Sequence, residues 1–87
     1  MENKEEESKI YLKITTPKGL LYGGSARSVS SFNKKGKFDV LISHINYVTK
    51  IEKQVEIITT EGELKVFPVE SGVLRAVENV VDVYLGI

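Results

Sequence analysis

The sequence predicts an all-β fold of the sandwich or closed-barrel type, and three observations support this prediction. Apolar and polar residues alternate with a period of two in several segments, which is the pattern of strands with one buried face. Turn-forming residues recur roughly every 8–12 residues, the spacing typical of such folds. Convincing helical periodicity is absent, because the one competing segment, residues 42–56, is rich in β-branched residues that favour strands.

A chain of 87 residues is expected to form one domain with one core. We predict that residues 1–8 form a disordered acidic tail and that residues 9–87 form the domain. The tail does not resemble a secretory signal, and no apolar run approaches the ~18 residues that span a bilayer. The absence of cysteine excludes disulfides and thiolate sites and fits a reducing compartment, so we expect a cytoplasmic protein.

The first half of the domain contains three predicted strands. In KIYLKITT every second residue from Ile10 is apolar, and the turn TPKG follows, because its proline fixes φ and its glycine permits a positive φ. The segment LLYGGSARSVSSF is a weaker strand with an expected bulge or bend at Gly23 and Gly24. After the turn NKKG, the segment KFDVLI alternates again, with three residues predicted to face inward: Phe38, Val40 and Ile42.

The second half continues the pattern. NYVTKI and QVEIIT are half-buried in pattern, TEGE is a turn centred on Gly62, and Pro68 restricts the end of LKVFPV to an edge or a bend. The segment GVLRAVENVVDVYLGI contains two strands joined by a tight turn at Glu78 and Asn79, where asparagine tolerates the left-handed conformation. The whole domain therefore contains seven to nine predicted short strands.

The zero net charge conceals an asymmetry along the chain. Residues 9–37 carry seven cations and no acid, residues 38–87 have a net charge of −4, and the tail has a net charge of −3. If the two halves of the domain lie on different faces, the resulting dipole would orient it on a partner. The alternative is a solvated surface with uneven patches.

No group of residues supports catalysis. Ser43, His44 and Asp39 resemble a triad in composition, but neighbours on a strand point to opposite faces, so the serine and the histidine diverge. One histidine without cysteine does not make a structural zinc site, and isolated aspartates do not make a calcium loop. We therefore predict a protein that is not an enzyme and has no cofactor and no metal.

Single-stranded nucleic acid is the less favoured alternative partner. Small β-barrels bind it with a basic groove and stacking aromatic side chains, and the lysines at 34, 35 and 37 lie beside Phe32 and Phe38. The chain has no net positive charge, however, and the alternating pattern assigns Phe38 to the core. We expect no nucleic-acid binding.

The order of the motifs resembles a known family. LKITTPKG is followed by a small-residue bend and then by GKFDVLISHINYVTKI, and SGVLRAVENVVDVYL comes later. This arrangement resembles the N-terminal domain of the epsilon subunit of F-type ATP synthases, called delta in mitochondria, over about residues 10–85. The matching residues of the central motif are Gly36, Phe38, Val40, Leu41, His44, Val48, Thr49 and Ile51.

The resemblance implies a β-sandwich of about ten short antiparallel strands. The family usually has prolines around the histidine, where this chain has Ile42, Ser43, Ile45, Asn46 and Tyr47. The family's C-terminal pair of antiparallel helices has no counterpart, so we expect either a natural short form or an excised domain without the inhibition and nucleotide sensing attributed to those helices.

The function implied by the resemblance is non-catalytic coupling between the central stalk and the rotor of a proton- or sodium-translocating F-type ATP synthase. The expected partners are the gamma subunit and the rotor-ring (c) subunits, on the cytoplasmic side of the membrane and bound to it only through the complex. The predicted rotor-ring end comprises Lys34, Lys35, Gly36, Lys37, Phe38, Ser43, His44, Ile45, Asn46 and Tyr47.

Two features leave alternatives open. Where the family often has an acid after the glycine, this chain has Lys37, and a cation would repel the arginine that rotor-ring loops usually present. The missing helices and the altered residues around His44 make a stand-alone interaction domain outside the synthase the alternative function. We expect His44 to be either an interface residue or a locally hydrogen-bonded side chain, with no acid–base role.

Five side chains are candidates for an exposed apolar patch: Leu20, Leu21, Tyr47, Phe67 and Tyr84.

Overall fold

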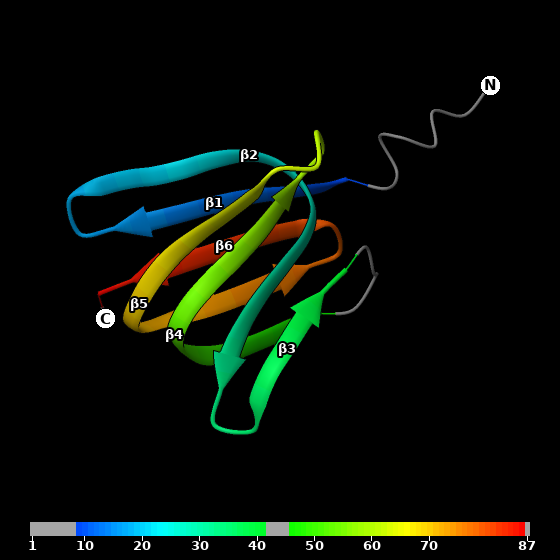
Figure 1. The fold of residues 1–87 in the computed structure, drawn as a ribbon. Helices are drawn as coiled ribbons and strands as arrows, with labels where there is room; N and C mark the ends of the chain where they lie inside the picture. Colours follow the sequence, from blue (N-terminus) through cyan, green and yellow to red (C-terminus); the bar gives the residue numbers. More distant parts are fainter. Residues whose placement is uncertain (1–8, 42–45, 87) are drawn as a thin grey trace.

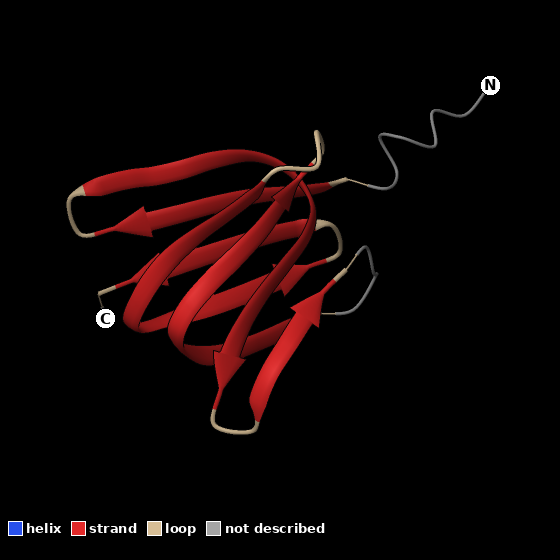
Figure 2. Ribbon diagram, viewed as in Figure 1, coloured by secondary structure: helices blue, strands red, loops and turns tan. Residues whose placement is uncertain are grey.

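The computed structural model of the chain describes residues 9–41 and 46–86, and within these ranges it contains six strands and no helix (Figures 1 and 2). The all-β prediction is therefore confirmed. The strands are β1 (Ile10–Thr16), β2 (Gly19–Asn33), β3 (Gly36–Val40), β4 (Tyr47–Thr59), β5 (Leu64–Val77) and β6 (Val80–Leu85).

The strands form a closed ring with one additional strand. Their hydrogen-bonded order is β1-β6-β5-β4-β2-β3, and a further pairing between β1 and β2 closes the first five into a ring. Strand β3 pairs with β2 alone, outside this ring. All pairings are antiparallel except that of β1 with β6, which is parallel. The expectation of a wholly antiparallel sandwich was wrong at this one pair.

The expected ten short strands were also wrong, because six long strands take their place. The predicted pieces NYVTKI and QVEIIT are both part of β4, and LKVFPV and GVLRAV are both part of β5. Strand β2 changes partner along its length: its second half pairs with β4, whereas its first half pairs with β1. Strands β4 and β5 stay paired with each other, and each gains a second partner over part of its length. Long strands that serve both layers in this way produce a flattened ring with the core inside (Figure 1).

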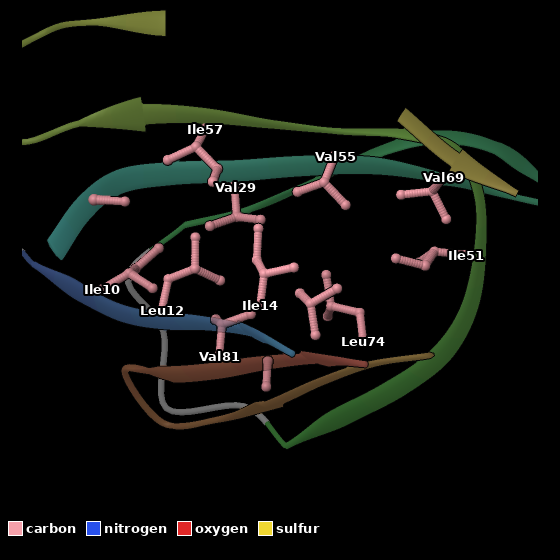
Figure 3. Close-up of a cluster of buried hydrophobic side chains, with 13 residues drawn as sticks. Ile10, Leu12, Ile14, Val29, Ile51, Val55, Ile57, Val69, Leu74 and Val81 are labelled. Atoms are coloured by element: carbon pink, nitrogen blue, oxygen red, sulfur yellow. The ribbon is translucent and has the colours of Figure 1, made fainter. Parts of the chain in front are cut away.

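A bulge bends β4 near its middle. The register with β5 shifts between Ile51 and Lys53, and Lys53 has a φ of 73°, a conformation that a residue with a Cβ adopts only at some cost. The ribbon of β4 turns sharply beside Ile51 in Figure 3. Opposite this bend lies Gly72, where an added Cβ would stand 2.6 Å from the Tyr84 carbonyl oxygen. A glycine is required there because the backbone of β6 approaches so closely.

The core is aliphatic and lies within the ring (Figure 3). Ile10, Leu12 and Ile14 are buried, as the alternation in β1 predicts, and they pack with residues from every other strand of the ring. Each such side chain contributes about 1.5–3 kcal/mol through burial. Aromatic residues border this core: the rings of Tyr22 and Phe67 lie 5.7 Å apart at the rim.

Three predicted turns are confirmed, and two local predictions are corrected. The glycines at the ends of TPKG, NKKG and within TEGE all have positive φ, from 92° to 126°. The register of β2 with β1 shifts at Leu21 rather than at Gly23 and Gly24, which pair regularly with β1. In the turn between β5 and β6, Glu78 and not Asn79 takes the positive φ, 54°.

Candidate partner interfaces

The two segments predicted to form the rotor-ring end meet, as far as the structure describes them. Residues 34–38 form the β2–β3 turn and the start of β3. Asn46 and Tyr47 stand at the beginning of β4 and are exposed. The ring of Tyr47 packs edge-on against that of Phe38, with centroids 5.8 Å apart, and the Tyr47 hydroxyl accepts a hydrogen bond from the Asn33 amide at 3.4 Å. The rest of the second segment, Ser43, His44 and Ile45, lies outside the described residues.

Lysines surround a half-buried phenylalanine at the β2–β3 hairpin. The ammonium groups of Lys37 and Lys53 lie 6.0 and 5.2 Å from the centroid of the Phe32 ring, within the range of cation–π attraction. Lys37 comes from β3 and Lys53 from the bulge of β4, and the phenylalanine between them belongs to β2. Three strands of the chain thus bring their side chains together here.

Glu56 is the acid that balances this group. Its carboxylate accepts a hydrogen bond from the Gln54 amide at 2.6 Å and pairs with Lys37 at 3.3 Å. These hydrogen bonds, that of Gln54 foremost, lower the pKa of Glu56, because they favour the charged form. The glutamate is therefore ionised at neutral pH and neutralises one of the lysines.

A hollow of about 390 Å³ adjoins the hairpin, where β4 and β5 bend. Its lining includes Asn33, Lys34 and Lys50 together with two acids, Glu52 and Glu70. We use the name lysine end for the five cations of this region, Lys34, Lys35, Lys37, Lys50 and Lys53. The sequence predicted only those of the turn, since the two on β4 are brought in by its pairing beside β2, for which one sequence offers no signal.

A smaller groove of about 230 Å³ is lined by residues of β3, the start of β4 and the end of β5. Its apolar lining comes from Phe38, Val40, Leu41, Tyr47 and Ala76. Two of these side chains, Phe38 and Val40, also pack against the core. Two acids, Asp39 and Glu78, complete the lining of the groove.

An exposed apolar surface covers the outer side of the sheet formed by β1 and β6. Tyr11 lies opposite Val80, and Tyr84 lies opposite Thr15, four pairs further along; between 39% and 45% of each of Tyr11, Val80 and Tyr84 is exposed. We call these three residues the tyrosine face. A central pair, Lys13 and Asp82, separates its two ends, giving the mixture of aromatic and polar groups that is typical of protein interfaces.

A second exposed surface lies on the outer side of β4 and β5. Ile58 pairs with Leu64, and Val66 follows two residues later on the same side of the strand; all three are exposed. We call them the aliphatic face. The sequence did not single them out, because LKVFPV carries apolar residues on both of its alternating sides. Of the five predicted candidates, Phe67 is half-buried and the others are exposed: Leu20, Leu21, Tyr47 and Tyr84.

Within the described ranges, no cluster of three or more histidines, cysteines or acids is placed to hold a metal ion. Asp39, the acid of the discarded triad, accepts a hydrogen bond from Ser30 on the neighbouring strand. No helix of sufficient length and apolarity to span a membrane occurs in these ranges either.

Comparison with known proteins gives a match over residues 9–85 to the family model of the ATP synthase delta/epsilon chain β-sandwich domain. The chain is similar to the ATP synthase epsilon chain of Endomicrobium trichonymphae, with 34% identity over 77 residues. It is also similar to that of Sulfurimonas denitrificans, with 42% identity over 48 residues. The first alignment covers 87% of this chain and the second 55%. They span only 55% and 37% of the two relatives, respectively.

Solved structures share the fold at low sequence identity. A chain of the Euglena gracilis mitochondrial ATP synthase superimposes on 90% of this chain, with a TM-score of 0.83 and 17% identity. A chain from the central stalk and c-ring of the Tetrahymena thermophila mitochondrial enzyme covers 93%, with a TM-score of 0.72 and 12% identity. This chain spans 51% and 66% of those two chains.

Proposed function

Because this chain belongs to the family of ATP synthase delta/epsilon β-sandwich domains, we propose that it is a non-catalytic coupling part of the central stalk of an F-type ATP synthase. It packs against the gamma subunit and rests on the rotor-ring (c) subunits, whose transported ion is a proton or sodium. It is held at the cytoplasmic side of the membrane only through the complex. The observation that carries this proposal is the family match over residues 9–85, together with exposed surfaces on that fold.

The tyrosine face is the surface that best suits the gamma subunit. Its two tyrosines offer large apolar area with a polar end, and each has few rotatable bonds to immobilise on binding. The sheet beneath it contains the fully buried Leu12, Val81 and Val83, so the face is rigidly supported. A rigid surface with aromatic anchors is the usual centre of a stable interface.

The lysine end, with Asn46 and Tyr47 beside it, is the surface that faces the rotor ring. The Tyr47 contacts with Phe38 and Asn33 hold the start of β4 against the β2–β3 hairpin. Chain segments that are far apart in sequence therefore form one continuous end of the molecule. Polar and charged groups dominate there, which suits a contact with the polar loops of a rotor.

The gamma contact is tested by measuring the dissociation constant of the chain for the gamma subunit of the same organism. The double variant Tyr11→Glu and Tyr84→Glu should weaken binding by at least about tenfold, because it replaces both aromatic anchors of the contact by charged side chains. The matched control is Ile58→Glu with Val66→Glu, which makes the same change on the aliphatic face. Circular dichroism melting should show both variants folded.

Two results would remove the tyrosine face as the gamma contact, and a third would reject the function. Equal weakening by both double variants would show that the tyrosine face is not the specific contact. Weakening by the control alone would move the contact to the aliphatic face. If the unaltered chain binds neither gamma nor the ring while an epsilon chain of a relative binds both in the same assay, the assembly function is rejected and the stand-alone interaction domain remains.

A further inference from the structure

The lysine end carries positive charge that the protein itself leaves largely unpaired. In residues 9–41 and 46–86, the only ion pair within 4 Å joins Lys37 to Glu56. Lys34 and Lys35 occupy the tip of the β2–β3 turn, where both are exposed. The backbone N–H of Lys35 donates a hydrogen bond to the Asn33 side chain at 2.9 Å, which fixes the turn. The turn therefore presents its ammonium groups outward on a defined backbone.

The aromatic ring of Phe32 holds the side chains of Lys37 and Lys53 in position. Lys37 and Lys53 come from different strands, yet both ammonium groups lie within about 6 Å of the Phe32 centroid. Two long side chains that are already restrained lose less conformational entropy when a partner binds. The arrangement thus resembles a prepared cationic surface more than a set of freely moving surface lysines.

The acidic residues of the same region favour a polypeptide over a nucleic acid as the partner. Glu52 lies opposite Phe32 in the strand register, and Glu56 lies beside Lys37; a continuous run of phosphates would be repelled by both. Proteins that bind single strands also need free aromatic faces on which bases stack, whereas the ring of Phe32 is only partly exposed and has a lysine ammonium at two positions around it. Separate carboxylates on a short loop can avoid the acids and meet the lysines.

We propose that the lysine end docks an acidic loop of the rotor ring, one that presents carboxylates where a basic loop would be repelled. This inference rests on the proposed function, in which this end faces the ring, and it specifies the chemistry of the partner. Charges of opposite sign across the contact accelerate association and exclude loops of the wrong sign. The rotor ring that binds this chain therefore differs from other rotor rings in the sign of the charge on its loop.

The test uses the whole chain and the detergent-purified ring of the same organism as the probe, with the dissociation constant measured at low and at high salt. The variant Lys34→Glu with Lys35→Glu should weaken ring binding by about tenfold or more at low salt. This loss should shrink at high salt, because screening reduces exposed charge interactions. The matched control, Lys18→Glu with Lys65→Glu, makes the same charge change at exposed sites outside this end and should change binding less than twofold.

A charge exchange makes the assignment specific. Replacing the acids of the ring loop by lysine should restore binding to the Lys34→Glu and Lys35→Glu variant and should weaken binding to the unaltered chain. Neither chain variant should change the affinity for the gamma subunit, which contacts a different face. This pattern of loss and restoration would support a direct contact between the lysines and the loop.

The possible failures separate this inference from the proposed function. If Lys34→Glu with Lys35→Glu leaves binding to the rotor ring unchanged or tightens it, the inference of an acidic loop is wrong, but the proposed rotor contact is unaffected. An unaltered chain that binds gamma but shows no affinity for the ring overturns both the rotor contact and this inference. Tighter binding to a twenty-residue oligo-dT than to the ring, lost on lysine reversal, overturns it in favour of phosphate recognition.

Discussion

The closed ring of five strands and the lysine end are built on different principles. In the ring, aliphatic side chains from all five strands fill the interior, and each strand has a neighbour on both sides over part of its length. At the lysine end, β3 pairs on one side only and the side chains are mostly exposed and charged. Stability therefore resides mainly in the ring, whereas the proposed rotor contact lies at the lysine end.

This division leaves the charge of the end free to differ while the fold stays constant. Substitutions at exposed turn positions usually change stability by less than about 0.5 kcal/mol, whereas core substitutions cost several times more. The fold is retained in chains with only 17% and 12% identity to this one. A lysine where the family often has an acid is thus compatible with an unchanged sandwich and a changed partner.

The largest expected effect comes from removing the same side chain from the interior of the ring and from an exposed position on one of its strands. Leu74→Ala should lower the free energy of unfolding by about 2–5 kcal/mol, because Leu74 is fully buried in the ring and its loss leaves a cavity. The control Leu20→Ala, at a leucine that is 64% exposed, should change it by less than about 0.5 kcal/mol. Urea unfolding followed by circular dichroism measures both.

A similar loss for the two leucines would contradict the division. It would mean that the hairpin carrying Leu20 is packed in solution, for example against a second molecule. Analytical ultracentrifugation of the unaltered chain would identify that case, since its apparent mass would exceed that of one chain.

Much of the fold is encoded in local pattern and could be predicted from it. The alternation in KIYLKITT placed Ile10, Leu12 and Ile14 in the core, and the glycine-containing turns were located correctly, because both depend on neighbouring residues. The continuity of β4 through Lys53 was not predictable in this way, since a positive φ at a lysine depends on tertiary packing. The parallel pairing of β1 with β6 joins the two ends of the chain and leaves no mark in either segment.

The candidate interfaces were predictable only where sequence neighbours form them. The lysines of the β2–β3 turn are adjacent in sequence and were identified, whereas Lys53 reaches Phe32 only through the pairing of β4 with β2. Ser43, His44 and Ile45 lie outside the described residues, so their assignment to the rotor-ring end stays a prediction. The aliphatic face was missed because Leu64 and Val66 alternate with Phe67 and Val69, and composition does not distinguish the two sides.

Two neighbouring serines of β2, one of them buried, offer a test whose expected effect on the free energy of unfolding is of intermediate size. Ser31 is fully buried and donates a hydrogen bond to the Gln54 carbonyl at 2.8 Å, beside the bulge of β4. Ser31→Ala should lower the free energy of unfolding by about 1–3 kcal/mol, because the carbonyl loses its partner inside the protein. The neighbouring Ser30→Ala, on the outer side of the same strand, should have a smaller effect. Equal effects would show that the inner bond does not support the bulge.

The smallest expected effect concerns the ion pair at the border of the lysine end. Hydrogen bonds from Gln54 and then Lys37 lower the pKa of Glu56 below its ordinary value of 4.5. A carboxyl whose pKa is lower in the folded state contributes stability above its unfolded pKa, and this contribution disappears as the pH falls through the folded pKa. Because the pair is at the surface, salt reduces its contribution further.

The stability difference between the unaltered chain and Glu56→Gln should therefore be largest at neutral pH and low salt, and it should vanish in acid below the lowered pKa. Melting temperatures measured from neutral to strongly acidic pH would reveal this. The control Glu61→Gln makes the same charge change at an exposed turn position, so it corrects for the overall loss of one negative charge. If the two variants have the same pH profile, Glu56 makes no specific contribution, and the lysine end is stabilised entirely by the ring on which it is built.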